Sequence, residues 1–305
     1  MRQKHIDKKL IHLPARLLLT LTAVATLFFY TEVSANASVE DVHEVANICM
    51  QVNRILKDYA LVGMEVDYHN PSKDLKEHLA LIEQEFKHLE KRDMNAKLTG
   101  EIAEIKKSWH AMKPEFEKKP DKSRMHDLLK QSEEYTHRCY QVAEDLAKDS
   151  NVEGEHYVIL VAQLGMESQR LAAEYIVHAW GTKDPLYEEE IKQIVADVES
   201  MIKELTAADD KLVSKDIKEK LKKVEKEFIS FGVMATSTSG RFMPSAAEKM
   251  ASSLFETIQG ILKQEQELVE GKVSGYFMPI ADEKTAGEIF RAITKIVAVA
   301  GEIRS

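Results

Sequence analysis

The sequence predicts an all-α fold of long helices, and three observations support this prediction. Apolar residues recur every three to four positions along most of the chain, which places them on one face of an α-helix. Glycine and proline are sparse, at 12 and 7 residues, while charged residues make up 30% of the chain, a balance typical of long amphipathic helices. No convincing run alternates apolar and polar residues as half-buried strands do, so we expect essentially no sheet.

The expected helices are separated by turn signals that contain Asn, Asp, Gly or Pro, residues that favour turns and helix ends. In chain order these signals are 69–71, 93–95, 119–121, 151–154, 183–185, 209–210 and 236–244. Within the first segment, the residues that form one apolar stripe are Val42, Val45, Cys49, Val52 and Leu56. The same spacing recurs in 121–148 and 152–181, so we expect a long helix in each of these three segments.

Parts of the sequence resemble one another. Residues 53–59 (NRILKDY) are similar to residues 169–175 (QRLAAEY) at an offset of 116 residues (169 − 53). Further similar pairs follow at nearly the same offset: 102–116 with 217–231, and 123–125 with 240–242. Self-similarity at a fixed spacing indicates a repeated structural unit.

We therefore predict two tandem repeats, 38–150 and 151–275, followed by a C-terminal helix within 276–305. Each repeat is expected to contain about three long helices, of which the middle one is broken. A helix with one apolar face buries that face only by packing against other helices. We expect one or two long antiparallel bundles, with crossing angles of about 20°.

The first 37 residues have the layout of a secretory signal peptide. A basic start is followed by an apolar run at residues 17–30 and by Ala-Asn-Ala at residues 35–37. The apolar run is shorter than the about 20 residues that a membrane span needs. We therefore expect cleavage after Ala37 and export of the chain; the alternative is an uncleaved N-terminal membrane anchor.

Charge and motifs exclude several classes of function. The formal net charge is −9, whereas nucleic-acid binding needs a concentrated basic face, so we expect no nucleic-acid partner. No Ser/His/Asp arrangement, Gly-rich phosphate loop or carboxylate pair stands out, so we expect neither an enzyme nor a cofactor. The best later apolar stretch, 293–303, contains Lys295 and Glu302; we expect no second membrane span and no output domain.

The two cysteines, Cys49 and Cys139, both fall on apolar stripes. An oxidising compartment permits a disulfide between them, and we treat the pair as a disulfide candidate. The alternative is two small core residues, since free cysteine is often buried. Aromatic residues at helical spacing are expected in the core rather than around a ligand cavity; these are Tyr59, Trp109, Tyr175 and Trp180.

Three glutamate–histidine pairs at a spacing of three are possible metal ligands. They are Glu85 with His88, Glu134 with His137, and Glu153 with His156. Di-iron helical bundles use two such pairs together with further glutamates. In a chain with 11 histidines and 51 acidic residues, a few such pairs arise by chance. We expect no metal site, and keep a metal-binding bundle as a third functional hypothesis.

The second repeat carries a family resemblance. Residues 168–175 (SQRLAAEY), followed by Ala-Trp-Gly at 179–181 and Asp-Pro at 184–185, resemble the first helix and turn of the PilJ-type domain. Residues 54–63 look like a weaker copy, and residues 241–244 resemble the stretch before the family's last helix. PilJ-type domains are periplasmic sensing domains of type IV pilus chemotaxis transducers, related to the input domains of nitrate/nitrite sensor kinases.

The family's signature helix reads GRQRMLSQR, and it matches residues 46–54 and 162–170 here. The resemblance implies five ligand-binding residues: Met50, Arg54, Met166, Gln169 and Arg170. In nitrate-responsive relatives an arginine precedes the methionine and binds the anion, whereas here Cys49 and Gly165 occupy that position. Neither offers a guanidinium for a planar anion. Arg54 and Arg170 lie off the apolar stripes, so we expect them to be exposed or to face a different interface.

The resemblance implies an exported, periplasmic sensor that binds a small anion or another small molecule between helices. It also implies signalling through a membrane chemoreceptor or sensor kinase, and a homodimer. The second hypothesis is a structural or adaptor protein that binds a membrane receptor and no small ligand.

Overall fold

The computed structural model describes residues 36–237 and 242–276, with side chains to residue 271. Within these residues the chain forms α-helices, one short 3-10 turn and no strand, so the predicted all-α class is confirmed. The helices are α2 (Val39–Gly63), α3 (Pro71–Leu89), α4 (Ala96–Phe116), α5 (Met125–Ser150), α6 (Glu155–Ala179), α7 (Tyr187–Ala207), α8 (Lys215–Ala235) and α9 (Pro244–Tyr276), with η1 (Lys122–Arg124) before α5. The predicted signal peptide, apart from Asn36 and Ala37, and nearly all of the predicted C-terminal helix lie outside the described residues.

Helix boundaries coincide with the predicted turn signals. Asn70 caps α3 by accepting a hydrogen bond from the backbone N–H of Lys73, and Pro71 follows at the first helical position, where its missing N–H costs nothing. Asn95 caps α4 and Ser214 caps α8 in the same way. Each middle helix that the sequence predicted as broken is therefore two separate helices, α3 with α4 and α7 with α8.

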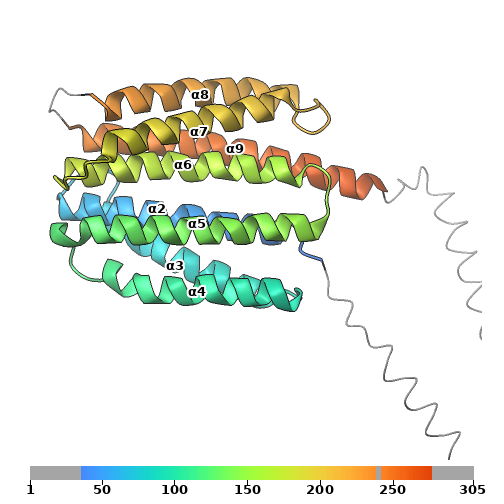
Figure 1. Ribbon diagram of the computed structural model, residues 1–305, viewed down its shortest axis with the longest axis horizontal. Helices are drawn as coiled ribbons and strands as arrows, with labels where there is room; N and C mark the ends of the chain where they lie inside the picture. Colours follow the sequence, from blue (N-terminus) through green and yellow to red (C-terminus); the bar gives the residue numbers. More distant parts are fainter. Residues whose placement is uncertain (1–35, 238–241, 277–305) are drawn as a thin grey trace, which may run out of the picture. The chain divides into compact units, whose positions relative to one another are not determined.

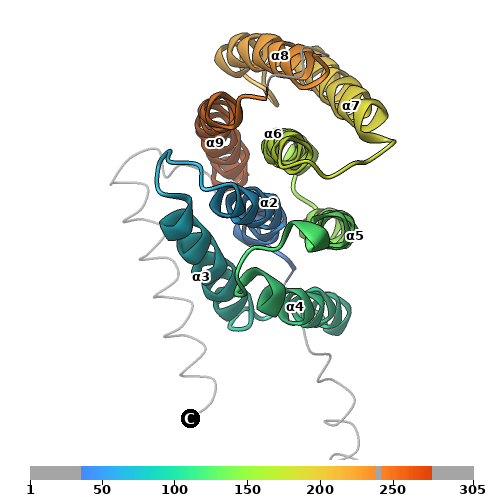
Figure 2. The same ribbon diagram turned by 90° about the vertical axis from the view of Figure 1, so that its left-hand side faces the viewer.

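The helices form layers. The long helices α2, α5, α6 and α9 lie side by side in the middle, and α2 packs directly on α6. The pair α3 and α4 covers one side of this group, and the pair α7 and α8 covers the other (Figures 1 and 2). In the described part of the chain, no helix is long and apolar enough to cross a membrane.

Buried aromatic side chains fill the spaces between the layers. Trp109 is fully buried, and Tyr59 and Tyr175 are almost so. Tyr59 donates a hydrogen bond to the carbonyl of Lys119 and accepts one from the backbone N–H of Asp121, while Tyr175 accepts one from the backbone N–H of Met243. Both tyrosines thus fix the segment that precedes a long helix, α5 or α9. The core position predicted for these three residues agrees with the structure; Trp180 is partly buried.

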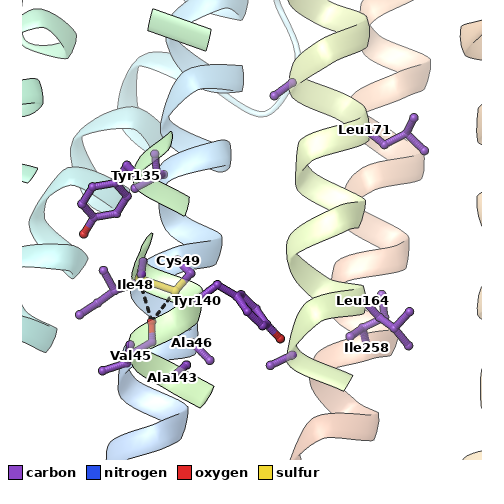
Figure 3. Close-up of a cluster of buried hydrophobic side chains, with 14 of the residues drawn as sticks. Val45, Ala46, Ile48, Cys49, Tyr135, Tyr140, Ala143, Leu164, Leu171 and Ile258 are labelled. Carbon is purple, nitrogen blue, oxygen red and sulfur yellow. Dashed lines mark hydrogen bonds between the residues drawn. A yellow bond between two sulfur atoms is a disulfide. The ribbon is translucent and has the colours of Figure 1, made fainter. Parts of the chain in front are cut away.

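A disulfide joins α2 to α5. Cys49 and Cys139 are both fully buried, with 5.7 Å between their Cα atoms, within the range that the bond requires. Figure 3 shows the bond among apolar side chains that include Val45, Ile48 and Ala143.

Candidate functional site

Two interior clusters combine charged side chains from several helices, one beside α2 and one beside α6. The first is centred on Lys57, whose side chain is only 3% exposed. Its Nζ lies 2.7 Å from Glu248 Oε2 on α9 and donates a hydrogen bond of 3.2 Å to Gln169 Oε1 on α6. Gln169 donates in turn to the carbonyl of Ala251. The cluster therefore connects α2, α6 and α9 through satisfied polar groups.

The next turn of α2 adds two further contacts to this cluster. Asp58 Oδ2 shares a hydrogen bond of 2.6 Å with His78 Nδ1 on α3. The Arg54 guanidinium lies 4.6 Å from the centre of the Phe255 ring on α9, a favourable cation–π distance. We call Arg54, Lys57, Asp58, His78 and Glu248 the α2 cluster; each of its two acids lies against a basic side chain.

The second cluster lies between α5, α6 and α7. Arg170 on α6 makes two ion pairs, with Glu133 on α5 at 2.9 Å and with Glu167 at 3.6 Å. Carboxylate oxygens of Glu133, Glu174 and Glu190, one from each of the three helices, all lie within 4.8 Å of one another. We call Glu133, Glu174 and Glu190 the glutamate triad.

Burial shifts the acids of this second cluster toward their neutral forms. Burial, and then the charges of Glu190 and Glu133, raises the pKa of Glu174 well above its usual range. Burial followed by Glu133 also raises the pKa of Glu190. Burial raises the pKa of Glu167 to about 7, although Arg170 opposes the shift. These directions follow from removing a carboxylate from water without a full set of compensating cations.

A groove with a volume of about 950 Å³ runs beside this cluster, between α5, α6 and α7. Met166, Tyr140 and Thr136 supply apolar and hydroxyl surface. The acidic side chains that line it are Glu133, Glu134, Glu144, Glu167 and Asp197, and its basic ones are Arg138, Arg170 and His137. With Arg170 already paired to two carboxylates, the lining carries an excess of negative charge.

The structure separates the five residues that the resemblance singled out. Met166 and Arg170 line the groove, whereas Gln169 points to the other side of α6 and holds Lys57. Met50 is fully buried and packs against α6 and α9. Arg54 contacts α9 through Phe255. Both arginines thus face another helix, which was one of the two expected placements.

Packing explains why no arginine precedes either methionine. A Cβ at Gly165 would lie 2.8 Å from Met50 Sδ and 3.5 Å from Ile258, so the helices approach too closely there for a long side chain. At the matching place on α2, the Cys49 side chain is engaged in the disulfide. A longer side chain at Gly165 would therefore require Met50 to move, and Cys49 is bonded to Cys139.

The glutamate–histidine pairs divide into different environments. Glu134, His137 and Glu153 are exposed, and His156 pairs with Glu204. Glu85 and His88 do come close to a third residue, Glu44. There, however, Asn47 donates a hydrogen bond to Glu85 and Arg92 lies 3.7 Å from Glu44, so protein groups already engage that set.

The sequence reasoning did not single out the glutamate triad. Its residues lie far apart in the chain and meet only through the packing of three helices. One signal was present: Glu174 interrupts the run Leu171-Ala172-Ala173-Glu174-Tyr175-Ile176-Val177, in which every residue is buried. An acid on a helix buried on all sides indicates either a partner charge or a site.

Comparisons of the chain with family models, with curated proteins and with solved structures found no match.

Proposed function

We propose that this chain is an exported, non-enzymatic sensor or ligand-binding protein whose ligand occupies the groove between α5, α6 and α7. The groove has the volume of a small-molecule site and combines apolar with charged walls. Its charged residues are held by neighbours on other helices, as Arg170 is by Glu133. Such fixed groups suit recognition, because little ordering remains to be done on binding.

The ligand class we propose is a small organic cation, such as a diamine or polyamine. The observation that carries this is the acidic excess of the groove lining, in which Arg170 is already neutralised by Glu133 and Glu167. A small anion, the ligand class implied by the resemblance, would need an uncommitted guanidinium.

We further infer that the chain is a tandem duplication of a four-helix unit, α2 to α5 and α6 to α9. Helix α2 begins at Val39 and α6 at Glu155, an offset of 116 residues (155 − 39), and both have 25 residues. Helix α5 begins at Met125 and α9 at Pro244, an offset of 119 (244 − 125). This order supports the predicted repeats and an antiparallel bundle. The PilJ-type resemblance, the periplasmic location, the receptor partner and the homodimer stay predictions.

A thermal-shift series on the purified chain tests the ligand class. Putrescine, spermidine, nitrate and nitrite are compared in the presence of a chelator. A ligand at 100 times its dissociation constant stabilises the folded state by about 2.7 kcal/mol. We expect the amines to raise the melting midpoint of the wild type.

Two substitutions locate the effect. Glu167→Gln removes a charge from the groove wall and should reduce the amine response, whereas Glu77→Gln, on an exposed carboxylate of α3, should not. An unchanged midpoint with both amines, or equal responses in the two variants, would contradict the proposal. A shift with nitrate alone would favour the anion.

A second candidate function, an adaptor without a small ligand, rests on exposed apolar side chains. They are Leu186, Ile229, Val233, Phe242 and Met243. The start of α7 and the end of α8 meet where Tyr187 donates a hydrogen bond to the carbonyl of Ala235, and His178 contacts the rings of Tyr187 and Phe242.

Crosslinking in intact cells tests this second candidate function. The wild type should capture a membrane receptor, and Val233→Lys should fail to capture it. Equal capture by both proteins would exclude this surface as the binding site.

A further inference from the structure

Three carboxylates converge on one point from three helices. The oxygens of Glu133 on α5, Glu174 on α6 and Glu190 on α7 lie within 4.8 Å of one another. Like charges at this separation repel strongly when they are buried. Helical packing holds them together nonetheless, so something must offset their repulsion, either protons or a cation.

Glu174 is the decisive member of the triad. Its side chain is 1% exposed, and its Oε1 has no hydrogen-bond partner in the described part of the chain; the same holds for Oε2 of Glu190. A buried carboxylate oxygen without a donor costs several kcal/mol of desolvation. One of the Glu174 carboxylate oxygens lies within 4.8 Å of oxygens of Glu133 and Glu190, where an ion would find three ligands.

The protein's own cations do not balance the triad. The two terminal nitrogens of Arg170 are already paired with Glu133 and Glu167. The surrounding charges that act on Glu174 are Glu190, Glu133 and Asp184 against the single cation Arg170. On Glu190 they are Glu133 and Asp184 against Arg170 and the exposed His126. Three acids therefore face one cation around Glu174, and around Glu190 two acids face two basic groups.

In the α2 cluster, by contrast, the buried acids have basic partners. Asp58 lies on α2 where Glu174 lies on α6, 116 residues later in the chain (174 − 58). Asp58 has His78 at 2.6 Å, and the preceding residue, Lys57, supplies an ammonium to the cluster. At the same offset α6 has Ala173 instead of lysine, and α7 has Ile194 instead of histidine. The two basic side chains are replaced by apolar ones, while the acid remains.

We propose that Glu133, Glu174 and Glu190 bind one hard divalent cation of the Mn²⁺, Mg²⁺ and Ca²⁺ class. The donor set consists of carboxylate oxygens, which suit these ions better than they suit Zn²⁺ or Cu²⁺. Glu133 and Glu190 are partly exposed, so water reaches the site and completes the coordination. Glu133 also lines the groove, so the ion lies at its edge. The proposal does not depend on an organic ligand being bound.

Manganese binding to the purified full chain, stripped with a chelator and free of amines, tests the proposal. Electron paramagnetic resonance counts free Mn²⁺ during the titration. We expect one Mn²⁺ per chain and displacement by Ca²⁺. Glu174→Gln and Glu190→Gln should each weaken binding by about tenfold or more, since even outer-shell substitutions cost that much at metal sites.

Three controls make the result specific. Glu85→Gln, in the other acidic group with Glu44 and His88, should retain wild-type Mn²⁺ affinity. Glu167→Gln, in the groove but outside the triad, should also retain it, which separates failure of the metal site from failure of the amine proposal. The melting midpoint of each metal-free variant shows that it is folded; if Glu174→Gln does not fold, Glu190→Gln decides. No Mn²⁺ binding up to about 1 mM, the weak end for such sites, or wild-type affinity in Glu190→Gln would overturn the proposal.

Discussion

The two clusters of buried charge are balanced in different ways. In the α2 cluster, Lys57 pairs with Glu248 and His78 lies 2.6 Å from Asp58, so each acid has a basic partner inside the protein. In the glutamate triad, Glu174 has an unpartnered oxygen, and α6 has Ala173 at the position that corresponds to Lys57. The difference indicates that the first cluster serves to hold helices together, while the second is arranged to receive a cation from outside.

A similar difference separates the contacts between long helices. In the first half a disulfide joins Cys49 on α2 to Cys139 on α5. In the second half the corresponding place on α6 is Gly165, which packs closely against Ile258 of α9 and Met50 of α2. One half is secured covalently and by ion pairs. The other relies on close packing at this place.

The largest expected effect comes from making the first half resemble the second. Lys57→Ala introduces alanine, the residue that α6 has at the corresponding position 173. It leaves Glu248 buried without its cation. Breaking a buried ion pair by removing one partner costs about 3–5 kcal/mol. Urea unfolding at pH 7 measures this loss. The double variant Lys57→Met with Glu248→Leu should recover most of it; a loss below about 1 kcal/mol in the single variant would show that the pair is not structural.

The next largest loss of stability should come from removing the disulfide. It closes a loop with a sequence separation of 90, and removing a native disulfide typically costs about 2–5 kcal/mol. We expect the Cys49→Ala, Cys139→Ala double variant to unfold at correspondingly lower denaturant concentration. Reduction of the wild type should have the same effect. Equal stability of the oxidised and reduced wild type would argue that the bond contributes nothing.

A smaller loss of stability should follow from Gly63→Ala. This variant ends α2 with alanine, the residue that ends α6. A Cβ at this position would clash with the Trp180 ring and would lie 2.9 Å from Pro120. Overpacking of this kind costs about 1–3 kcal/mol. Gly100→Ala is the matched control, since nothing lies near its Cβ, and it should stabilise α4 by about 0.5–1 kcal/mol. Stabilisation by both variants would mean that Trp180 moves aside freely.

A further prediction concerns pH and the first residue of two corresponding long helices, Val39 of α2 and Glu155 of α6. Burial, with a contribution from Asp41, raises the pKa of Glu155 to about 8 from the usual 4.5. The folded state therefore holds a proton that the unfolded state releases between these values, so this group's contribution to stability is complete below pH 4.5 and is lost as pH rises to 8.

Glu155→Gln should remove that dependence. We expect its melting midpoint to exceed that of the wild type at pH 8 and the difference to shrink toward pH 5. If the melting midpoints of the wild type and of Glu155→Gln change by the same amount between pH 5 and 8, the result would contradict the assignment.

Much of the fold could be predicted from local patterns, because helix stripes and caps are properties of neighbouring residues. The break at Asn70 and Pro71 and the placement of both cysteines on apolar stripes are examples. The triad could not be predicted in this way. Spacing shows which face of a helix Glu174 occupies, but not that α5 and α7 place Glu133 and Glu190 against that face. Arg170 was found by resemblance, yet its two carboxylate partners emerged only from the packing.

The contrast between the halves is tested most directly by measuring Mn²⁺ stoichiometry in two matched variants, Glu174→Gln and Asp58→Asn. Each variant neutralises one of two corresponding acids, Glu174 on α6 or Asp58 on α2. We expect one bound Mn²⁺ in the wild type and in Asp58→Asn, and loss of binding in Glu174→Gln. Equal binding by the two variants would contradict the claim that the glutamate triad, and not the α2 cluster, is built to take a cation.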